Sequence, residues 1–416
     1  MYDFAVIWEW VEFAVRWTHV ITAIAWIGSS FYFIALDLGL HRDRNLASGA
    51  DGEEWQVHGG GFYHIQKYLV APASMPDHLV WFKWESYMTW LSGFTMLVLV
   101  YYLGAEFYLV DPAVADLAIW QAIVISMASL AFGWVAYNTL CKLFVNANQT
   151  ALMVALFGVL VAMSYFYTQV FSGRAALLHL GAFTASIMSA NVFFIIMPNQ
   201  RVVVADLKAG RKPDPKYGKI AKQRSTHNNY LTLPVLFLML SNHYPLAFAT
   251  PYNWAIASLV FLMGVTIRHW FNTQHARKGA PHWTWAATVI LMIVIAWLSS
   301  FRHDAPVEEA ALRGPALTYA SAEGFDEVTS IVQGRCSMCH AAEPAWEGLL
   351  WAPKAVLLET PAQIAQEARR IYVQAGLTHA MPPANLSYIE PQEREAIIRW
   401  YQGASAGSEA ASGTDS

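Results

Sequence analysis

Charged residues are scarce in this sequence. Only 13% of its 416 residues are Asp, Glu, Lys or Arg, whereas 56% are hydrophobic and 18 are Trp. Soluble globular proteins carry about twice that share of charge, so the composition excludes an ordinary soluble protein. The net charge of −4, without a basic stripe, excludes an electrostatic surface for nucleic acid. The sequence therefore predicts a protein that lies largely in lipid.

Signatures of several common enzyme classes are also missing. The Walker, Rossmann and zinc-protease patterns are absent, and so is a flavin fingerprint. The chain lacks paired spans interrupted by Gly or Pro in matching halves, which would indicate an inverted-repeat transporter. No short cleavable leader is visible, because the acidic start MYDFAVIWEWVEF runs straight into a long apolar stretch. We expect this stretch to be the first membrane span.

Eight apolar stretches approach the length that a bilayer demands, which is ~20 residues. Their expected limits are Phe13–Leu36, Tyr87–Leu103, Leu117–Leu140, Ala151–Val170, Ala175–Met197, Leu231–Phe248, Trp254–Trp270 and Trp283–Phe301. Aromatic residues crowd their edges, as in YYLGAEFY, which is typical of side chains at headgroup level. The sequence predicts an all-α fold, a polytopic membrane bundle of about eight transmembrane helices followed by a small domain.

Lys and Arg are distributed unevenly among the predicted loops. The loops after the odd-numbered spans hold 15 of them, whereas the loops after the second, fourth and sixth spans hold one. The loop between the fifth and sixth spans contributes most, from Arg201 to Arg224. Because cytoplasmic loops carry the excess of positive charge, we expect both termini outside the cytoplasm.

The most specific motif follows the last span. The pentapeptide CSMCH at 336–340 is the attachment pattern of a c-type haem, with Cys336 and Cys339 as the thioether residues and His340 as an axial ligand. In the loop THAMPP, Met381 is expected to be the second axial ligand, with His379 as its competitor. With its opening helix GFDEVTSIVQGR and closing helix PQEREAIIRWYQG, this part of the chain resembles a class I cytochrome c.

These features divide the chain into four parts. Residues 1–301 are expected to form the transmembrane domain, 302–322 a linker, 323–403 the cytochrome c domain and 404–416 a disordered tail. Haem is joined to such motifs on the oxidising, outer side of the membrane, where the charge rule independently places the cytochrome domain. The third cysteine, Cys141, is expected to be a small buried residue.

Polar residues among the spans are more numerous than a mere anchor needs, which makes them functional candidates. Under the expected topology they form two layers. The layer nearer the cytoplasm holds His58, His64, Lys67, His78, Lys83, Glu85, Asn138, His227, Asn228, Asn229, His269 and Asn272. The layer nearer the outside holds His19, His179, Asn242 and His243. Each has a structural alternative as a helix cap, an interhelical hydrogen bond or a headgroup contact.

Local strings make the sequence distinctive: HVITAIAWIGSSFYF, HGGGFYHIQKY, LVWFKWESYMTWLSG, NANQTAL, HNNYLTLPVLFLMLSNHYP and RHWFNTQH. With the haem-binding tail, they resemble the bacterial membrane-bound urate oxidases (urate hydroxylases) that carry a fused cytochrome c domain. The resemblance implies oxidation of urate to 5-hydroxyisourate, with electrons leaving through one covalent haem c to the respiratory chain and no formation of hydrogen peroxide. It also implies the bacterial inner membrane, with both termini and the cytochrome domain on the periplasmic side.

Under this resemblance the acceptor is a soluble or membrane cytochrome or a terminal oxidase, and the oligomeric state stays open. Urate is a flat, largely monoanionic purine, so its site needs a cation or His, amide side chains and aromatic walls. The candidates for the catalytic site are Lys83, Glu85, His227, Asn228, Asn229 and His269, with Asn272 as a further contributor. Glu85 or a neighbouring His is the expected base.

A second haem is a further hypothesis. The hydrocarbon layer is ~30 Å thick, too far for one fast electron transfer from a cytoplasmic site to an outer haem. His19 lies in a stretch that is similar to those of membrane proteins with b-type haem, and His179 and His243 share its layer. A b haem held by His19 and His179 would provide a relay, whereas the alternative is that these are structural histidines in a packed bundle.

Two other functions remain open at this stage. The chain is alternatively a non-catalytic subunit that anchors a cytochrome within a larger quinol or other dehydrogenase complex, its polar residues then contacting quinone or partner. Reduction of the haem by urate alone would separate the two readings. A transporter or sensor with a redox tail is disfavoured by the lack of an inverted repeat.

Overall fold

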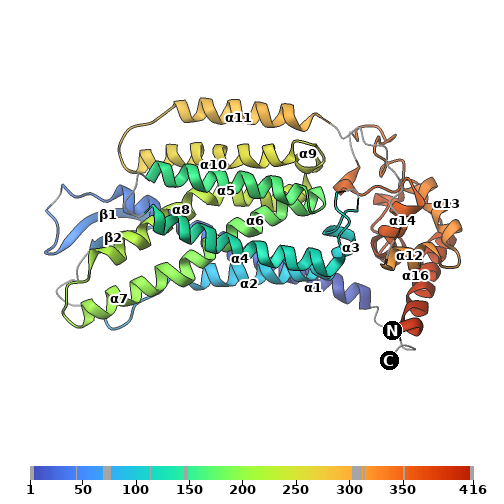
Figure 1. Cartoon of the computed structure of the whole chain (residues 1–416), viewed down its shortest axis with the longest axis horizontal. Helices are drawn as coiled ribbons and strands as arrows, with labels where there is room; N and C mark the ends of the chain where they lie inside the picture. Colours follow the sequence, from blue (N-terminus) through green and yellow to red (C-terminus); the bar gives the residue numbers. More distant parts are fainter. Residues whose placement is uncertain are drawn as a thin grey trace.

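The computed structural model describes residues 4–43, 45–68, 76–112, 114–144, 149–301, 312, 314–349 and 352–412. Within these residues a bundle of long helices has a two-stranded hairpin at one end and a smaller helical domain at the other. Both chain termini lie beside this C-terminal domain (Figure 1). We refer below to the hairpin end and the C-terminal-domain end of the bundle.

The bundle contains all eight of the expected apolar stretches in helical form. Its helices are α1 (Phe4–Gly39), α2 (Trp84–Met96) with the π-helix η1 (Leu97–Tyr102), α4 (Ile119–Leu143), α5 (Gln149–Thr168), α6 (Gly173–Ala190), the π-helix η2 (Asn191–Ile196), α7 (Met197–Lys208), α8 (Pro215–Leu240), α10 (Asn253–His275) and α11 (Trp283–Ser299). Short pieces connect them: α3 (Ala105–Tyr108), the 3₁₀-helix η3 (Ser241–His243) and α9 (Pro245–Phe248).

Five helical segments of the described residues are long and apolar enough to cross a membrane. They are Val6–Gly39, α4, α5, the continuous segment Gly173–Lys208 and α10. Helix α11 is apolar but shorter. The second and sixth expected spans do not meet these criteria. The second is interrupted by a π-helical turn, and the sixth belongs to a helix whose first half is polar.

Helix α8 begins well before the expected limit at Leu231. The Asp214 side chain accepts a hydrogen bond from the Lys216 backbone N–H at 2.9 Å, and Pro215 takes the first helical position. Hydropathy detects only apolar runs, so it missed this polar half of the helix. The half is nevertheless helical because Lys, Arg, His and Asn can all be accommodated in a helix. The extension matters because His227, Asn228 and Asn229 therefore lie on a regular helix inside the bundle.

The expectation of an all-α fold is wrong in one place. Strands β1 (Ala50–His58) and β2 (Gly61–Tyr68) pair antiparallel in the loop after the first span. Their two-residue turn places Gly59 at φ 58° and Gly60 at φ 78°, which only glycine adopts readily. The turn lies in the string HGGGFY, whose Gly-Gly pair between two strand-like segments was the available signal.

The C-terminal domain has a hydrophobic core of its own. Helices α12 (Gly314–Ala320), α13 (Phe325–Arg335), α14 (Pro361–Gln366), α15 (Ala368–Ile371) and α16 (Pro391–Ser412), the π-helix η5 (Tyr372–Leu377) and the 3₁₀-turns η4 (Pro353–Ala355) and η6 (Pro383–Asn385) build it. The core includes Val328, Ile364 and Trp400, and helix α13 packs against α16 as expected for the opening and closing helices.

The limits of this domain are wider than expected. Helix α12 lies in the expected linker and packs against α14 and α16, because Ala316 and Tyr319 contribute apolar surface. Helix α16 continues to Ser412, into the expected disordered tail, since its Ala-rich sequence favours helix. Residues 302–311 and 313 of the expected linker lie outside the described residues. Residues 413–416 of the expected tail also lie outside them.

Close packing of α4 against α6 depends on Gly133. A Cβ at this position would lie 2.6 Å from the ring of Phe183, which is completely buried. We expect Gly133→Ala to lower the free energy of unfolding by about 1–3 kcal/mol, because the enclosed ring has nowhere to move. Thermal unfolding of the purified protein, followed by Trp fluorescence, measures the change.

Gly158→Ala is the matched control, since nothing lies within 4 Å of a Cβ there. It should keep or slightly raise the unfolding temperature, because Ala is the better helix former. Equal responses of the two variants would contradict the packing described.

Candidate functional site

Three consecutive residues of α8 connect most of the candidate side chains. His227, Asn228 and Asn229 are all buried. Successive residues of an α-helix point about 100° apart, so these three side chains face different neighbouring helices. His227 contacts α4, Asn228 contacts α6 and η2, and Asn229 contacts α10. The expected residues are therefore divided between two polar clusters on different faces of α8.

The first cluster, the Arg224 cluster, surrounds a buried guanidinium. It consists of Arg224, Asn138, Tyr137, Asn191, His227 and Asn228. Arg224 donates to Asn138 Oδ1 at 2.9 Å and to Asn191 Oδ1 at 3.4 Å, and its Cζ lies 4.8 Å from the centre of the Tyr137 ring. No carboxylate of the described residues forms an ion pair with it.

The hydrogen bonds of this cluster form a chain that begins at a group that only donates and ends at a group that only accepts, and these two ends determine the direction of each bond. Arg224 only donates, so Asn191 presents Oδ1 to it and Nδ2 to Tyr137 and to Asn228 Oδ1. At the other end, Asn228 Nδ2 donates to the Met188 carbonyl, which only accepts. Reversing either amide would oppose two donors or two acceptors, so both orientations are determined.

The same chain reaches His227. The Tyr137 oxygen accepts from Asn191 Nδ2 and lies 2.8 Å from His227 Nδ1, and Tyr137 also hydrogen-bonds the Cys141 thiol. His227 Nδ1 is therefore engaged within the cluster. Glu85 and a neighbouring His stay predictions for the base.

The second cluster, the Arg268 cluster, consists of Arg268, Asn229, Asn272 and Phe31. Arg268 donates to Asn229 Oδ1 from Nε at 3.2 Å and from Nη2 at 3.1 Å, and to Asn272 Oδ1 at 2.9 Å. Asn272 Nδ2 donates to Asn229 Oδ1 at 3.0 Å. The guanidinium lies 4.1 Å from the centre of the Phe31 ring on α1.

Sequence reasoning missed Arg268 and assigned Arg224 only to a basic loop. The available signal was an Arg within an apolar helix, four residues before Asn272 on the same face. Asn191 was missed because it lies at the junction of α6 with the π-helix η2, where an apolar run hides a single amide. The structure identifies both arginines through their burial, 3% exposed for Arg224 and 4% for Arg268.

The other expected catalytic residues lie on the neighbouring helices. Lys83 precedes α2, with Nζ 5.7 Å from the ring of Trp84, and Glu85 lies in the first turn of that helix. Glu85 Oε2 is buried and makes no hydrogen bond to a described residue. Within the described residues His269 makes no hydrogen bond to the Arg268 cluster, and its Nδ1 contacts the Tyr230 hydroxyl at 3.5 Å.

The remaining residues of the expected inner layer belong mainly to the hairpin end. His64 pairs with Glu53 at 2.8 Å and stacks on Trp55, while Lys67 and Lys222 both pair with Asp37, which joins the hairpin to α1 and α8. His58 and His78 are exposed. These contacts are structural and lie outside both clusters.

The histidines of the expected outer layer do not form one site. His179 is completely buried, and both ring nitrogens are engaged at 2.8 Å, Nδ1 with the Ala175 carbonyl and Nε2 with Ser126 Oγ. His19 instead contacts the Thr89 carbonyl at 3.0 Å on α2, and His243 is exposed. This geometry favours the structural alternative for His179 and provides no support for a haem between His19 and His179.

The cysteine motif of the C-terminal domain presents two free thiols beside an oriented histidine. Cys336 and Cys339 are free thiols, and burial raises the pKa of the Cys336 thiol to about 11. His340 Nδ1 bonds the Val356 carbonyl at 2.9 Å, which orients the ring and leaves Nε2 for a metal. Met381 is partly buried in its loop, whereas His379 is exposed. These residues fit the expected haem c.

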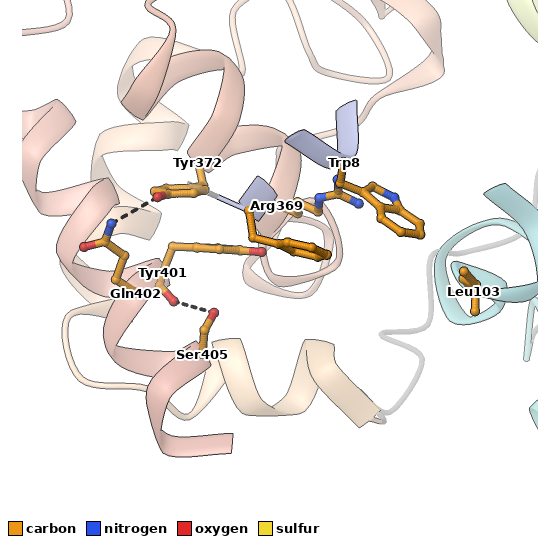
Figure 2. Close-up of a pocket in the computed structure, with 8 residues that line it drawn as sticks. Trp8, Leu103, Arg369, Tyr372, Tyr401, Gln402 and Ser405 are labelled. Atoms are coloured by element: carbon orange, nitrogen blue, oxygen red, sulfur yellow. Dashed lines mark hydrogen bonds between the residues drawn. The ribbon is translucent and has the colours of Figure 1, made fainter. Parts of the chain in front are cut away.

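The C-terminal domain contacts the bundle through two arginines. Arg369 pairs with Glu9 at 3.4 Å and Glu12 at 3.8 Å on α1, and Arg370 lies 4.8 Å from the centre of the Tyr108 ring. A cavity of about 500 Å³ opens here, lined by Phe4, Trp8, Leu103, Arg369, Tyr372, Tyr401, Gln402 and Ser405. Figure 2 shows Trp8 and Leu103 of the bundle facing residues of the C-terminal domain across it. The cavity is distinct from both clusters on α8.

Comparison with known proteins decides the family. Residues 5–299 match the family model described as urate oxidase N-terminal. The chain belongs to the urate oxidase N-terminal family. The match covers well over half of the chain and includes every residue of both clusters. No curated protein and no solved structure matches the chain.

Membership of the urate oxidase N-terminal family confirms the urate oxidase relationship expected from the sequence and supports a urate-related oxidoreductase activity. The match ends before the cysteine motif, so the haem remains a prediction. Among the described residues, no group of three or more His, Cys, Asp and Glu is arranged to hold a metal ion.

The hydrogen bonds of the Arg224 cluster predict a lower free energy of unfolding when one of its asparagines is replaced. We expect Asn191→Leu to lower the free energy of unfolding by roughly 2–4 kcal/mol, because Arg224, Tyr137 and Asn228 each lose a partner in a buried setting. Thermal unfolding followed by Trp fluorescence measures the loss.

Asn242→Leu is the matched control, since the Asn242 amide makes no hydrogen bond to a described residue and its Oδ1 is buried. This variant should unfold near the wild-type temperature. If both variants were equally unstable, the hydrogen-bond chain would not be the cause.

Proposed function

We propose that the protein is a membrane-bound oxidase that converts urate to 5-hydroxyisourate and delivers the electrons through a covalent c haem to a cytochrome or terminal oxidase of the respiratory chain. The observation that carries this proposal is that the urate oxidase N-terminal region contains a buried arginine, Arg268, held by the neutral amides of Asn229 and Asn272 beside the polar half of α8. A buried cation without an acidic partner suits a ligand that brings negative charge, and urate is such a ligand.

The reaction needs water, a base and a one-electron acceptor. Urate and water give 5-hydroxyisourate, two protons and two electrons. Among the described residues, Glu85 offers a buried carboxylate oxygen without a hydrogen-bond partner, which is the feature expected of a base that takes a proton from the purine or from water. Lys83, two residues away, adds positive charge near the start of α2.

The residues of the C-terminal domain supply the exit for electrons. Cys336, Cys339, His340 and Met381 are the residues that would hold a c haem, and such a haem would supply one-electron transfer. Arg394 donates to the Met381 carbonyl at 3.0 Å and to Asn385 at 3.3 Å, which stabilises the loop that carries the proposed ligand.

A bacterial inner membrane with the hairpin end in the cytoplasm accommodates both parts of this proposal. The basic residues gather at the hairpin end, whereas the C-terminal domain lies at the opposite end with both termini (Figure 1). Urate would then enter from the cytoplasm, and the haem would lie in the periplasm. The five apolar helical segments supply the surface for lipid contact.

The role of Glu85 has a direct test. We expect Glu85→Gln to lower the rate of urate oxidation by about 100-fold or more, because an amide cannot take up the proton. The measurement is the initial rate of anaerobic haem reduction after mixing with urate.

Glu106→Gln is the matched control, since Glu106 Oε1 is also buried without a hydrogen-bond partner but lies at the C-terminal-domain end. It should keep wild-type kinetics. Wild-type turnover by the Glu85 variant would remove Glu85 as the base.

The haem site has its own test, which is independent of turnover. After expression in cells competent for cytochrome c maturation, the wild-type chain should retain haem on a denaturing gel. Cys336→Ser with Cys339→Ser should lose it, because no thiol remains to attach the porphyrin. Cys141→Ser, which removes the buried third cysteine, should keep the haem. A wild-type chain without covalent haem would exclude the proposed electron exit.

A further inference from the structure

Arg268 is a buried cation without a described counter-charge. It is 4% exposed, and its three hydrogen bonds go to the amide oxygens of Asn229 and Asn272, which are neutral. Among the described residues no Asp or Glu pairs with it. Neutral acceptors orient a guanidinium but leave its charge in place, and a buried charge is costly unless an opposite charge joins it.

The arginine determines how Asn229 presents its amide. Because Arg268 and Asn272 Nδ2 both donate to Asn229 Oδ1, the Asn229 Nδ2 group is directed away from them. Asn229 is 0% exposed, and its Nδ2 makes no hydrogen bond to a described residue. Buried amide donors without a partner are rare in native proteins. The cluster thus holds a donor in place that has no acceptor in the protein.

One nitrogen of the Arg268 guanidinium, Nη1, has no hydrogen-bond partner among the described residues. Its Nε and Nη2 are used by the two amides, while Nη1 has no hydrogen-bond partner among the described residues and is not fully enclosed. The Phe31 ring lies 4.1 Å from its Cζ and shields the guanidinium from water. Arg268 Nη1 and Asn229 Nδ2 are therefore two donors beside one positive charge, which is the chemistry that recognises an anionic oxygen or ring nitrogen.

The Arg224 cluster differs in the way that matters for ligand binding. Both terminal nitrogens of Arg224 bond asparagine oxygens, and the chain of amides that it starts closes on the Met188 carbonyl. The amide donors of Asn191 and Asn228 therefore all have acceptors within the Arg224 cluster. In the Arg268 cluster the buried Asn229 Nδ2 has no acceptor among the described residues, so this cluster is the one with an amide donor left for a ligand.

We propose that Arg268 and Asn229 bind the negatively charged edge of the substrate, so that Arg268 selects the monoanion of urate over neutral purines. This inference rests on the proposed function for the identity of the purine. Asn272 acts as a positioning residue, because it bonds both Arg268 and Asn229. Selection by charge explains why Arg268 is kept in a buried position without a carboxylate partner among the described residues.

The test measures binding separately from turnover. Full-length protein in detergent is reduced with dithionite under anaerobic conditions, so that it binds urate without oxidising it, and urate is titrated by equilibrium dialysis. Competition with xanthine, at a pH where xanthine is neutral, reports the charge preference. We expect Arg268→Gln to weaken urate binding by about 10- to 100-fold and to change xanthine binding little. Arg268→Lys should keep the preference for urate with weaker binding, because an ammonium retains the charge but not the fork of donors.

Arg224→Gln is the matched control, a second buried arginine held by asparagines. Its folded fraction should keep the wild-type urate affinity and charge preference. Unchanged urate affinity in Arg268→Gln, or an equal loss in both variants, would overturn the inference while leaving urate-driven haem reduction intact. If the wild-type protein bound urate without reducing its haem, the proposed function would fail and the inference would stand. If it bound no urate, both would be overturned.

Discussion

Positive charge held inside an apolar bundle is the constraint on which the arrangement of this protein depends. Two guanidinium groups are buried, Arg224 on α8 and Arg268 on the neighbouring α10, and each contacts asparagine oxygens and an aromatic ring. Asparagine supplies an oxygen without a charge, so it satisfies donors while leaving the field of the cation uncancelled. A carboxylate beside Arg268 would have neutralised its charge and removed the electrostatic reason for an anion to bind there.

This constraint also explains the order of residues along α8. A helix with a polar first half and an apolar second half is a poor membrane span by composition, yet its buried residues include Arg224, His227, Asn228 and Asn229 in less than two turns. Their hydrogen-bond partners lie on four neighbouring segments, which are α4, α6, η2 and α10. Helix α8 is thus surrounded by protein on most of its circumference, where polar groups are tolerated because other side chains satisfy them.

The sequence predicted those parts of the molecule that depend on local pattern. The apolar stretches are helical, and the motif at 336–340 adjoins a helix packed against α16, as its spacing suggests. The parts that depend on long-range partners were missed. Arg268 is a lone charge in the sequence, and it becomes meaningful only when Asn229, 39 positions earlier, is placed against it. The hairpin and the early start of α8 were missed because hydropathy registers apolar length, not the caps and glycine turns that begin and end elements.

A column of packed rings links the interior of α6 to the C-terminal domain. Buried rings contact one another from Phe183 through Tyr167, His179 and Tyr101 to Tyr108, with centroids 5.7–6.4 Å apart, and Tyr108 meets Arg370 of the C-terminal domain. Such a column has little freedom to rearrange, because interiors are packed as densely as crystals. The position of the C-terminal domain relative to the bundle is therefore set by this column and by the pairing of Arg369 with α1. A haem attached at Cys336 and Cys339 would thus be held at a fixed distance from α8, so its rate of reduction would depend on packing within the bundle.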